Sequence, residues 1–119
     1  MSAARKDLVI EKGATFRRLF TWKTDLIFSP VDLTGCTVKM QIRKDYNDTA
    51  VILELSTEGT TPYITLNPRY GEIYINVPSD ITRTLPIDRG HYDLEVTHPD
   101  ESVTRLLYGV ADIKDEITL

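Results

Sequence analysis

The feature that most constrains this chain is a strict alternation of apolar and polar residues in four separate segments. In segment 38–43, Val, Met and Ile alternate with Lys, Gln and Arg. Successive side chains of an extended chain point to opposite faces, so the alternation predicts a strand with one buried and one solvated face. The same pattern recurs in three further segments, 51–55, 73–77 and 92–96. We therefore predict an all-β fold.

Four further apolar segments bring the predicted strands to about eight; they lie at 8–10, 16–22, 63–66 and 103–113. Residues typical of turns, mainly Pro, Gly, Asn and Asp, separate the segments. Strands spaced about ten residues apart favour an antiparallel sandwich or barrel. One helical turn is expected at 79–85, where Ser79 or Asp80 would cap the first turn and Pro86 would end the helix.

The chain has 119 residues, which is room for a single hydrophobic core. We expect residues 1–7 to form a flexible N-terminal arm and residues 8–119 to form one domain. Cys36 is alone, so no disulfide can form within the chain. The formal net charge of -4 argues against nucleic-acid binding, and the lack of a long apolar run argues against export by a signal peptide or insertion in a membrane.

Two predicted strands are apolar on both faces. In 16–22, Leu19 lies opposite the face that carries the aromatic residues. The segment 103–113 carries Leu106, Tyr108 and Val110 on one face and Val103, Leu107 and Ile113 on the other. Such a strand either contains a β-bulge that switches its facing or is covered by another protein chain. We favour the bulge; under the alternative, Leu106, Tyr108 and Val110 are candidate partner-contact residues.

The segment 88–94 carries the most specific structural motif. Asp88, Gly90 and Tyr92 have the spacing of the tyrosine corner of immunoglobulin-like sandwiches, in which the tyrosine hydroxyl bonds back across the preceding connection. Leu94 stands where antibody domains carry a core cysteine, so a hydrophobic side chain would replace the disulfide. The predicted fold is an immunoglobulin-like antiparallel β-sandwich of seven or eight strands.

Residues that could carry chemistry do not form a recognisable catalytic motif. His91, Asp93 and Glu95 would share one strand face, either as ligands of a metal ion or as the solvated face of an amphipathic strand. We favour the solvated face, because side chains along one strand do not converge by themselves. Motifs of nucleophilic catalysis and of phosphate-binding glycine loops are absent. We therefore expect no enzymatic activity, no cofactor and no catalytic or metal site.

Aromatic residues offer a second kind of candidate site. Arg17 and Arg18 adjoin aromatic residues of 16–22, a combination that can stack a base or a sugar, or that places aromatics in the core and arginines outside. We favour the second interpretation. A carbohydrate platform is the other hypothesis, built from Trp22, Tyr63, Tyr70 and Tyr74.

Three stretches of the chain carry a resemblance to a known group of proteins. They are Glu11–Phe16 leading to Pro30–Gly35, Gly71–Leu85 leading to Tyr92–Glu95, and Val103–Gly109. Together they resemble small virion structural proteins of tailed bacteriophages, related in pattern to the immunoglobulin-like N-terminal domain of baseplate upper proteins. The resemblance spans about residues 8–118, and it departs at 86–89, where the approach to the Gly-x-Tyr motif is longer.

The resemblance implies a non-enzymatic virion component, assembled in the cytoplasm of the host bacterium, that contacts other virion proteins in multiple copies or as a homo-oligomer. We expect a tail component at the baseplate or fibre attachment; the alternatives are a capsid decoration protein or a carbohydrate-binding adhesion module. No nucleic-acid or membrane partner is expected, and a glycan is the weaker partner. Leu33, Thr34 and Gly35 are either a partner-contact loop or a turn into the strand at Val38, and we favour the turn.

Overall fold

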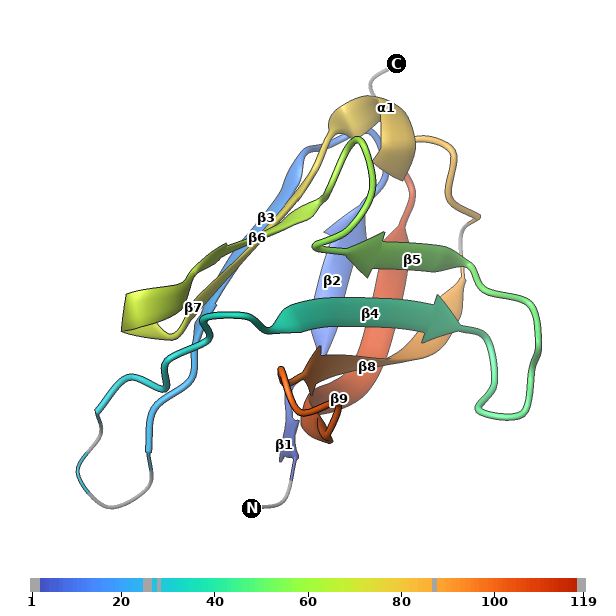
Figure 1. Ribbon diagram of the computed structural model, residues 1–119. Helices are drawn as coiled ribbons and strands as arrows, with labels where there is room; N and C mark the ends of the chain where they lie inside the picture. Colours follow the sequence, from blue (N-terminus) through green and yellow to red (C-terminus); the bar gives the residue numbers. More distant parts are fainter. Residues whose placement is uncertain (1–2, 25–26, 28, 87, 118–119) are drawn as a thin grey trace.

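All eight predicted strands and one further short strand form two sheets in the computed structural model of this chain (Figure 1). The structure describes residues 3–24, 27, 29–86 and 88–117. The large sheet contains β1 (Ala4–Arg5), β2 (Leu8–Glu11), β4 (Thr37–Arg43), β5 (Leu53–Ser56), β8 (Arg89–Thr97) and β9 (Val103–Lys114). The small sheet contains β3 (Phe16–Thr21), β6 (Ile64–Asn67) and β7 (Glu72–Val77). Two short helical segments are η1 (Pro68–Tyr70) and α1 (Ser79–Thr82).

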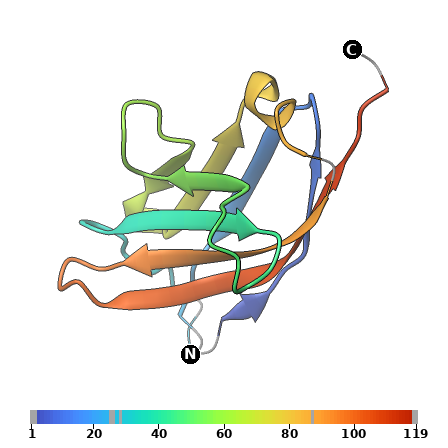
Figure 2. The same ribbon diagram turned by 90° about the vertical axis from the view of Figure 1, so that its right-hand side faces the viewer.

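The strand order identifies the architecture. The large sheet has the order β1-β9-β8-β4-β5, with β2 also on β9, and the small sheet has the order β3-β7-β6. Neighbouring strands are antiparallel except β1 and β2, which run parallel to β9. Figure 2 shows β5, β4, β8 and β9 lying side by side in the large sheet. This order matches the G, F, C and C′ strands facing the B, E and D strands of a variable-type immunoglobulin domain, and it confirms the predicted sandwich.

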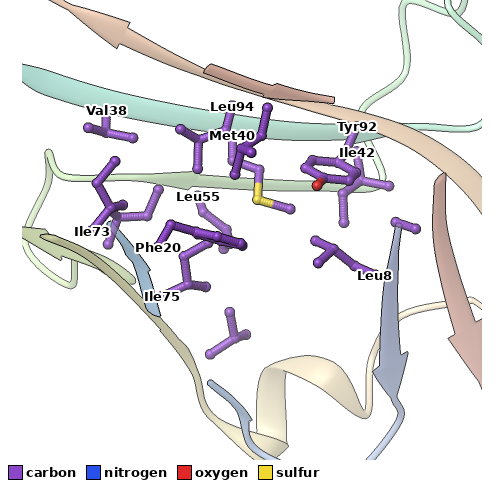
Figure 3. Packing of buried hydrophobic residues seen from close by; sticks show 14 of the residues in the cluster. Leu8, Phe20, Val38, Met40, Ile42, Leu55, Ile73, Ile75, Tyr92 and Leu94 are labelled. Carbon is purple, nitrogen blue, oxygen red and sulfur yellow. The ribbon is translucent and has the colours of Figure 1, made fainter. Parts of the chain in front are cut away.

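The alternation seen in the sequence directs one face of each sheet into a shared core. Met40 and Leu94 of the large sheet point toward Phe20 and Ile75 of the small sheet (Figure 3). Leu94 is 0% exposed, as expected for a residue in the position of a core cysteine. Full burial of one such side chain contributes about 1.5–3 kcal/mol. The predicted strand at 51–55 begins later than expected, because Val51 is exposed and precedes β5.

A β-bulge was expected in two strands, and the structure has it in β9 but not in β3, which pairs with β7 in an unbroken register and leaves Leu19 exposed. Leu94 of β8 is opposite Leu107, whereas the next residue, Glu95, is opposite Arg105. Leu106 is therefore an extra residue without a partner on β8. The bulge brings two successive leucines, Leu106 and Leu107, into buried positions, and it accounts for the apolar character of β9 on both faces.

The helical turn is shorter than the predicted 79–85. It ends at Thr82, before Pro86, and neither Ser79 nor Asp80 caps it with its side chain; Pro78 is the N-cap. Thr82 is fully buried, and its hydroxyl donates to the Ala14 carbonyl while accepting the Gly13 amide. This tie to the turn between β2 and β3 fixes where the helix lies, and local capping signals do not encode such a distant contact.

The predicted flexible arm, residues 1–7, is not an arm over the part that the structure describes. Residues 1 and 2 lie outside the described residues, but Ala4 and Arg5 form β1 along β9. The Lys6 amide donates to the Tyr108 carbonyl at 2.8 Å, and the Asp7 carboxylate accepts the Val110 amide at 2.9 Å. Ala4 and Arg5 thus belong to the large sheet, and Lys6 and Asp7 are held against β9 by hydrogen bonds. The prediction failed because two residues are too few to show an alternating pattern.

Candidate protein-binding surface

A groove of about 560 Å³ opens at the side of the sandwich where β1 and the bulge of β9 face β3. We call it the edge groove, and it is lined by Ala4, Arg5, Lys6, Leu19, Phe20, Thr21, Trp22, Lys23, Leu106 and Leu107. Phe20, Leu106 and Leu107 are buried, at 8–9% exposed, and supply its apolar surface. Arg5, Lys6 and Lys23 are exposed and surround that surface with positive charge.

The β-bulge and the pattern of β3 build this groove. The extra residue Leu106 adds a second leucine beside Leu107, and Phe20 belongs to the inward-facing set of β3. The ammonium group of Lys6 lies 5.9 Å from the centroid of the Phe20 ring, within range of a cation–π interaction. The groove therefore joins apolar and basic groups from the two sheets, which sequence patterns do not place side by side.

The strand β3 forms one border of the edge groove and one edge of the small sheet. It pairs with β7 on one side, and within the described residues no strand pairs with its other side. A strand edge with unpaired amides and carbonyls is a template for another extended chain. The outward face of β3 adds an exposed apolar contact, because Leu19 is 48% exposed opposite Tyr74, which is 41% exposed.

Basic side chains continue along β3. Arg17 donates to the Asn76 side chain, and the Arg18 guanidinium lies 4.7 Å from the Phe16 ring and donates to the Arg17 carbonyl. Arg18 shares a strand face with Phe16 and Phe20, opposite the buried Ile75, so the predicted outward facing holds for Arg17 and is wrong for Arg18. The Arg18 side chain is nevertheless exposed, because it lies over the Phe16 ring at the edge of the sheet. Within the described residues, neither arginine makes an ion pair.

The tyrosine-corner prediction is wrong in its acceptor. The Tyr92 hydroxyl donates to the carbonyl of Lys6 in the N-terminal segment and not to the connection before β8. Burial, followed by the nearby Asp7 carboxylate, raises the pKa of Tyr92 to about 12. Asp88 instead accepts its neighbour's amide and lies 3.6 Å from Lys44. Gly90 leaves room for the strand beside it, since a Cβ there would stand 2.8 Å from the Arg43 carbonyl oxygen.

The N-terminal segment that borders the groove is held by Tyr92 and by Asp7. The Val110 amide, and then the Arg5 guanidinium, lower the pKa of Asp7. At Gly109 an added Cβ would stand 2.5 Å from the Lys6 carbonyl oxygen, so a side chain there would push the segment away from β9. The sequence analysis missed these contacts. The signal was Gly109 itself, because a glycine inside an apolar strand indicates a close backbone approach.

The predicted partner-contact residues of β9 do not form one patch. Leu106 lines the edge groove. Tyr108 and Val110 are opposite Asp93 and His91, on the outer face of the large sheet. Tyr108 is half-buried and Val110 is buried. The bulge separates the three residues, because it changes which face the strand presents after Leu106.

Leu33, Thr34 and Gly35 form a turn that leads into β4. Leu33 is 0% exposed, and its carbonyl accepts the Cys36 amide at 2.9 Å. The Asp32 carboxylate accepts the amide and the hydroxyl of Thr34, and these bonds lower the pKa of Asp32. Gly35 has a φ of +79°, a left-handed conformation that suits glycine. The turn interpretation is confirmed, and the contact-loop interpretation is wrong for the buried Leu33.

The outer face of the large sheet is a network of paired charges. Arg105 lies 3.2 Å from Asp93 and 4.0 Å from Glu95, and the His91 ring stacks on Tyr46 with centroids 4.6 Å apart. These side chains line a shallow hollow of about 320 Å³. The pairing with Arg105 agrees with the amphipathic-strand interpretation. In the part of the chain that the structure covers, no three His, Cys, Asp or Glu residues are grouped to hold a metal ion.

The hypothesised carbohydrate platform is divided between the two faces of the small sheet. Trp22 packs against the core, whereas Tyr74 lies on the outer face opposite Leu19. The indole nitrogen of Trp22 is buried and has no hydrogen-bond acceptor among the described residues. His98 lies beside Trp22, with ring centroids 5.9 Å apart, and its Nδ1 is 3.8 Å from the Cys36 sulfur. Burial raises the pKa of that thiol.

None of the helices that the structure describes has both the length and the apolar character needed to span a bilayer.

Comparison with known proteins finds similarity in structure alone. No protein-family model matches the chain, and no curated protein matches it in sequence. Among solved structures, the chain is similar to the extracellular domain of the voltage-gated sodium channel β4 subunit, with a TM-score of 0.51 and 12% identity. The alignment covers 98% of this chain and 97% of that one. That protein forms parallel homodimers and has a role in cell–cell adhesion. The similarity establishes the immunoglobulin-like fold of this chain.

Proposed function

We propose that this protein is a non-enzymatic binding module that works by protein–protein contact, as a structural component of a tailed-phage virion. The observation that carries the proposal is the edge groove, where an apolar surface meets a strand edge without a partner in the described residues. Both features are used by proteins that bind other chains. The resemblance of the sequence to small virion proteins supports a role in the virion. The location that we propose for the protein is the tail, at the baseplate or at fibre attachment.

The proposal includes several copies of the protein in one particle. A closed symmetric arrangement repeats the same contact, so weak contacts add to a stable assembly. The sodium channel β4 domain with a similar fold forms parallel homodimers, which is consistent with self-association in an immunoglobulin-like sandwich. The expected result in sedimentation or native mass measurement is a species larger than 13.6 kDa, either alone or with its attachment partner.

The location is tested by labelling. A tagged copy is expressed during particle production, and purified particles are imaged with a label against the tag. The proposal predicts label on the tail. Label on the capsid would instead establish the decoration-protein alternative, and particles that contain no copy of the protein would reject a virion role altogether.

The adhesion alternative is tested separately with a glycan array. Trp22 and Tyr74 lie on opposite faces of the small sheet, so we expect no glycan to bind. Saturable binding of a glycan that Tyr74→Ala abolishes would overturn this expectation, and Tyr46→Ala, at an exposed tyrosine on the other side of the sandwich, is the matched control.

A further inference from the structure

We infer that the edge groove binds an extended acidic segment of a partner protein, which adds as a strand to the unpaired side of β3. The inference deepens the proposed function, since it rests on the protein being a protein-binding module and names the chemistry of the partner. Three observations carry it: the direction of the β3 backbone groups, the apolar surface beside them, and the charge around both.

The backbone of β3 presents alternate residues to the unpaired side. The Trp22 amide donates to the Gly71 carbonyl at 2.8 Å, on the β7 side. In an antiparallel pair the hydrogen-bonded residues alternate, so the backbone amides and carbonyls of the even-numbered residues of β3 point toward β7. The amides and carbonyls of Arg17, Leu19 and Thr21 therefore point away from β7. The Arg18 guanidinium donates to the Arg17 carbonyl at 2.7 Å, as expected for a carbonyl that no strand has bound.

This pattern also sets the length of strand that fits. Among the residues that the structure describes, the backbone groups of Leu19 and Thr21 have no hydrogen-bond partner, while the Arg17 carbonyl accepts a bond from Arg18. The groove lining follows the chain from Leu19 to Lys23, which at about 3.3 Å per residue is about 16 Å. A segment of about four to six extended residues fills that length.

The apolar surface of the groove lies next to that unpaired side. Side chains of an added strand alternate between the two faces of the small sheet. Those on the inner face would cover Phe20 and Leu106, which already line the groove. Those on the outer face would lie beside Leu19, which is 48% exposed. The occupant therefore carries apolar side chains at alternate positions on at least its inner face.

The charge around the groove selects an acidic partner. Arg5, Lys6 and Lys23 line it, and Arg17 and Arg18 extend the same border. Arg5 is 3.3 Å from Asp7, whereas the other four make no ion pair within the described residues. This is a local excess of positive charge on a chain whose net charge is -4. Carboxylates spaced along an extended segment complement it.

The charge argues against a second copy of β3 as the occupant, since self-pairing would bring Arg17, Arg18 and Lys23 of both copies together. The strand edge favours a peptide over a nucleic acid, because only a polypeptide supplies the alternating amides and carbonyls that the unpaired side of β3 can bond. Recognition is therefore expected to combine backbone pairing with charge.

The test uses the whole purified chain and the fluorescence of Trp22, its single tryptophan, which lines the groove. The probe is a blocked peptide that alternates glutamate and valine. Three comparison ligands are the same peptide with alternate backbone amides methylated, a peptide that alternates lysine and valine, and a short oligothymidine. We expect the acidic peptide to bind at least tenfold more tightly than each of the three, and its affinity to fall as salt is added.

Variants test backbone pairing and charge recognition separately. Leu19→Pro removes an amide on the unpaired side of β3, where proline is tolerated, and should abolish binding. Lys6→Glu combined with Lys23→Glu should weaken binding at least tenfold without involving the backbone. Lys39→Glu, at an exposed lysine on the outer face of the large sheet, is the matched control and should bind as the unchanged protein does.

Each outcome decides the inference. Equal binding of the methylated peptide rejects strand addition, and equal binding of the lysine peptide rejects charge selection. Tight binding of oligothymidine alone identifies the groove as a site for a polyanion instead, and no binding of any probe overturns the inference. Since purified protein is used, acidic-peptide binding by a protein that is absent from virions would reject the virion proposal while upholding this one.

Discussion

Two charged regions of this molecule behave differently. On the outer face of the large sheet, basic and acidic residues alternate across neighbouring strands, and Arg105 pairs with Asp93 while Lys39 pairs with Glu54. Around the edge groove, Lys6 and Lys23 lie beside apolar surface, and neither makes an ion pair within the described residues. The charges of the first region pair with one another and face solvent. The edge groove has basic side chains, apolar surface and backbone groups that a second protein chain could pair with or cover.

The comparison assumes that both regions rest on one rigid core, and Leu94→Ala tests this with the largest expected effect. Leu94 is 0% exposed between the sheets, so its truncation should lower the free energy of unfolding by about 2–5 kcal/mol. Urea denaturation measures the loss. The matched control is Leu19→Ala, where the leucine is 48% exposed and the loss should stay below about 1 kcal/mol. Equal losses at the two positions would contradict the packing described.

The second prediction concerns the segment that borders the groove. Tyr92→Phe leaves the Lys6 carbonyl without its hydroxyl donor, and should lower the free energy of unfolding by about 1–2 kcal/mol. Because the same segment lines the groove, binding of the acidic peptide should weaken as well. Tyr108→Phe on the outer face is the control, with no comparable loss expected. A loss of stability with unchanged peptide affinity would separate the N-terminal segment from the binding surface.

The pKa of Tyr92 gives the third prediction. Its value in the fold is raised to about 12 from an ordinary 10, so the folded state holds the phenolic proton more tightly than the unfolded chain. The resulting stabilisation is fully present below pH 10 and is lost as the pH rises from 10 toward 12. The free energy of unfolding, measured by urea denaturation, should therefore fall more steeply with pH over this range in the unchanged protein than in Tyr92→Phe. Parallel pH curves would show that Tyr92 is not buried against Lys6.

The smallest expected effects test the comparison itself. Arg105→Ala removes ion pairs on an exposed face, and should cost less than about 1 kcal/mol of stability without changing peptide affinity. Lys23→Ala should leave stability unchanged and weaken peptide binding. Denaturation and fluorescence titration of both variants provide the measurements. The reverse pattern, with Arg105 governing the peptide, would move the binding surface to the outer face of the large sheet.

The sequence was sufficient to locate strands and core residues where apolar residues follow a regular pattern. Alternation located four strands and apolar segments located four more, and the apolar character of 103–113 on both faces indicated a bulge, which the structure has at Leu106. It also identified Leu94 as a core residue. These predictions succeeded because a strand with one buried face requires an apolar residue at every second position.

The candidate site was only partly predictable, because it depends on distant contacts. The Tyr92 hydroxyl binds Lys6, 86 residues earlier in the chain, so its local spacing suggested the wrong acceptor. The edge groove combines Leu106 with Phe20 from the opposite sheet, and no local pattern places those residues together. Leu106 was nevertheless among the predicted contact residues, since an apolar side chain on the wrong face marks a departure from regular burial.

The unpaired side of β3 can be observed residue by residue. Amide nuclear magnetic resonance spectra, recorded with and without the acidic peptide, report hydrogen exchange at each position of the strand. The account predicts that the amides of Arg17, Leu19 and Thr21 become protected from exchange, while those of Arg18 and Phe20, which face β7, change little. Protection confined to the outer face of the large sheet, or no new protection along β3, would contradict it.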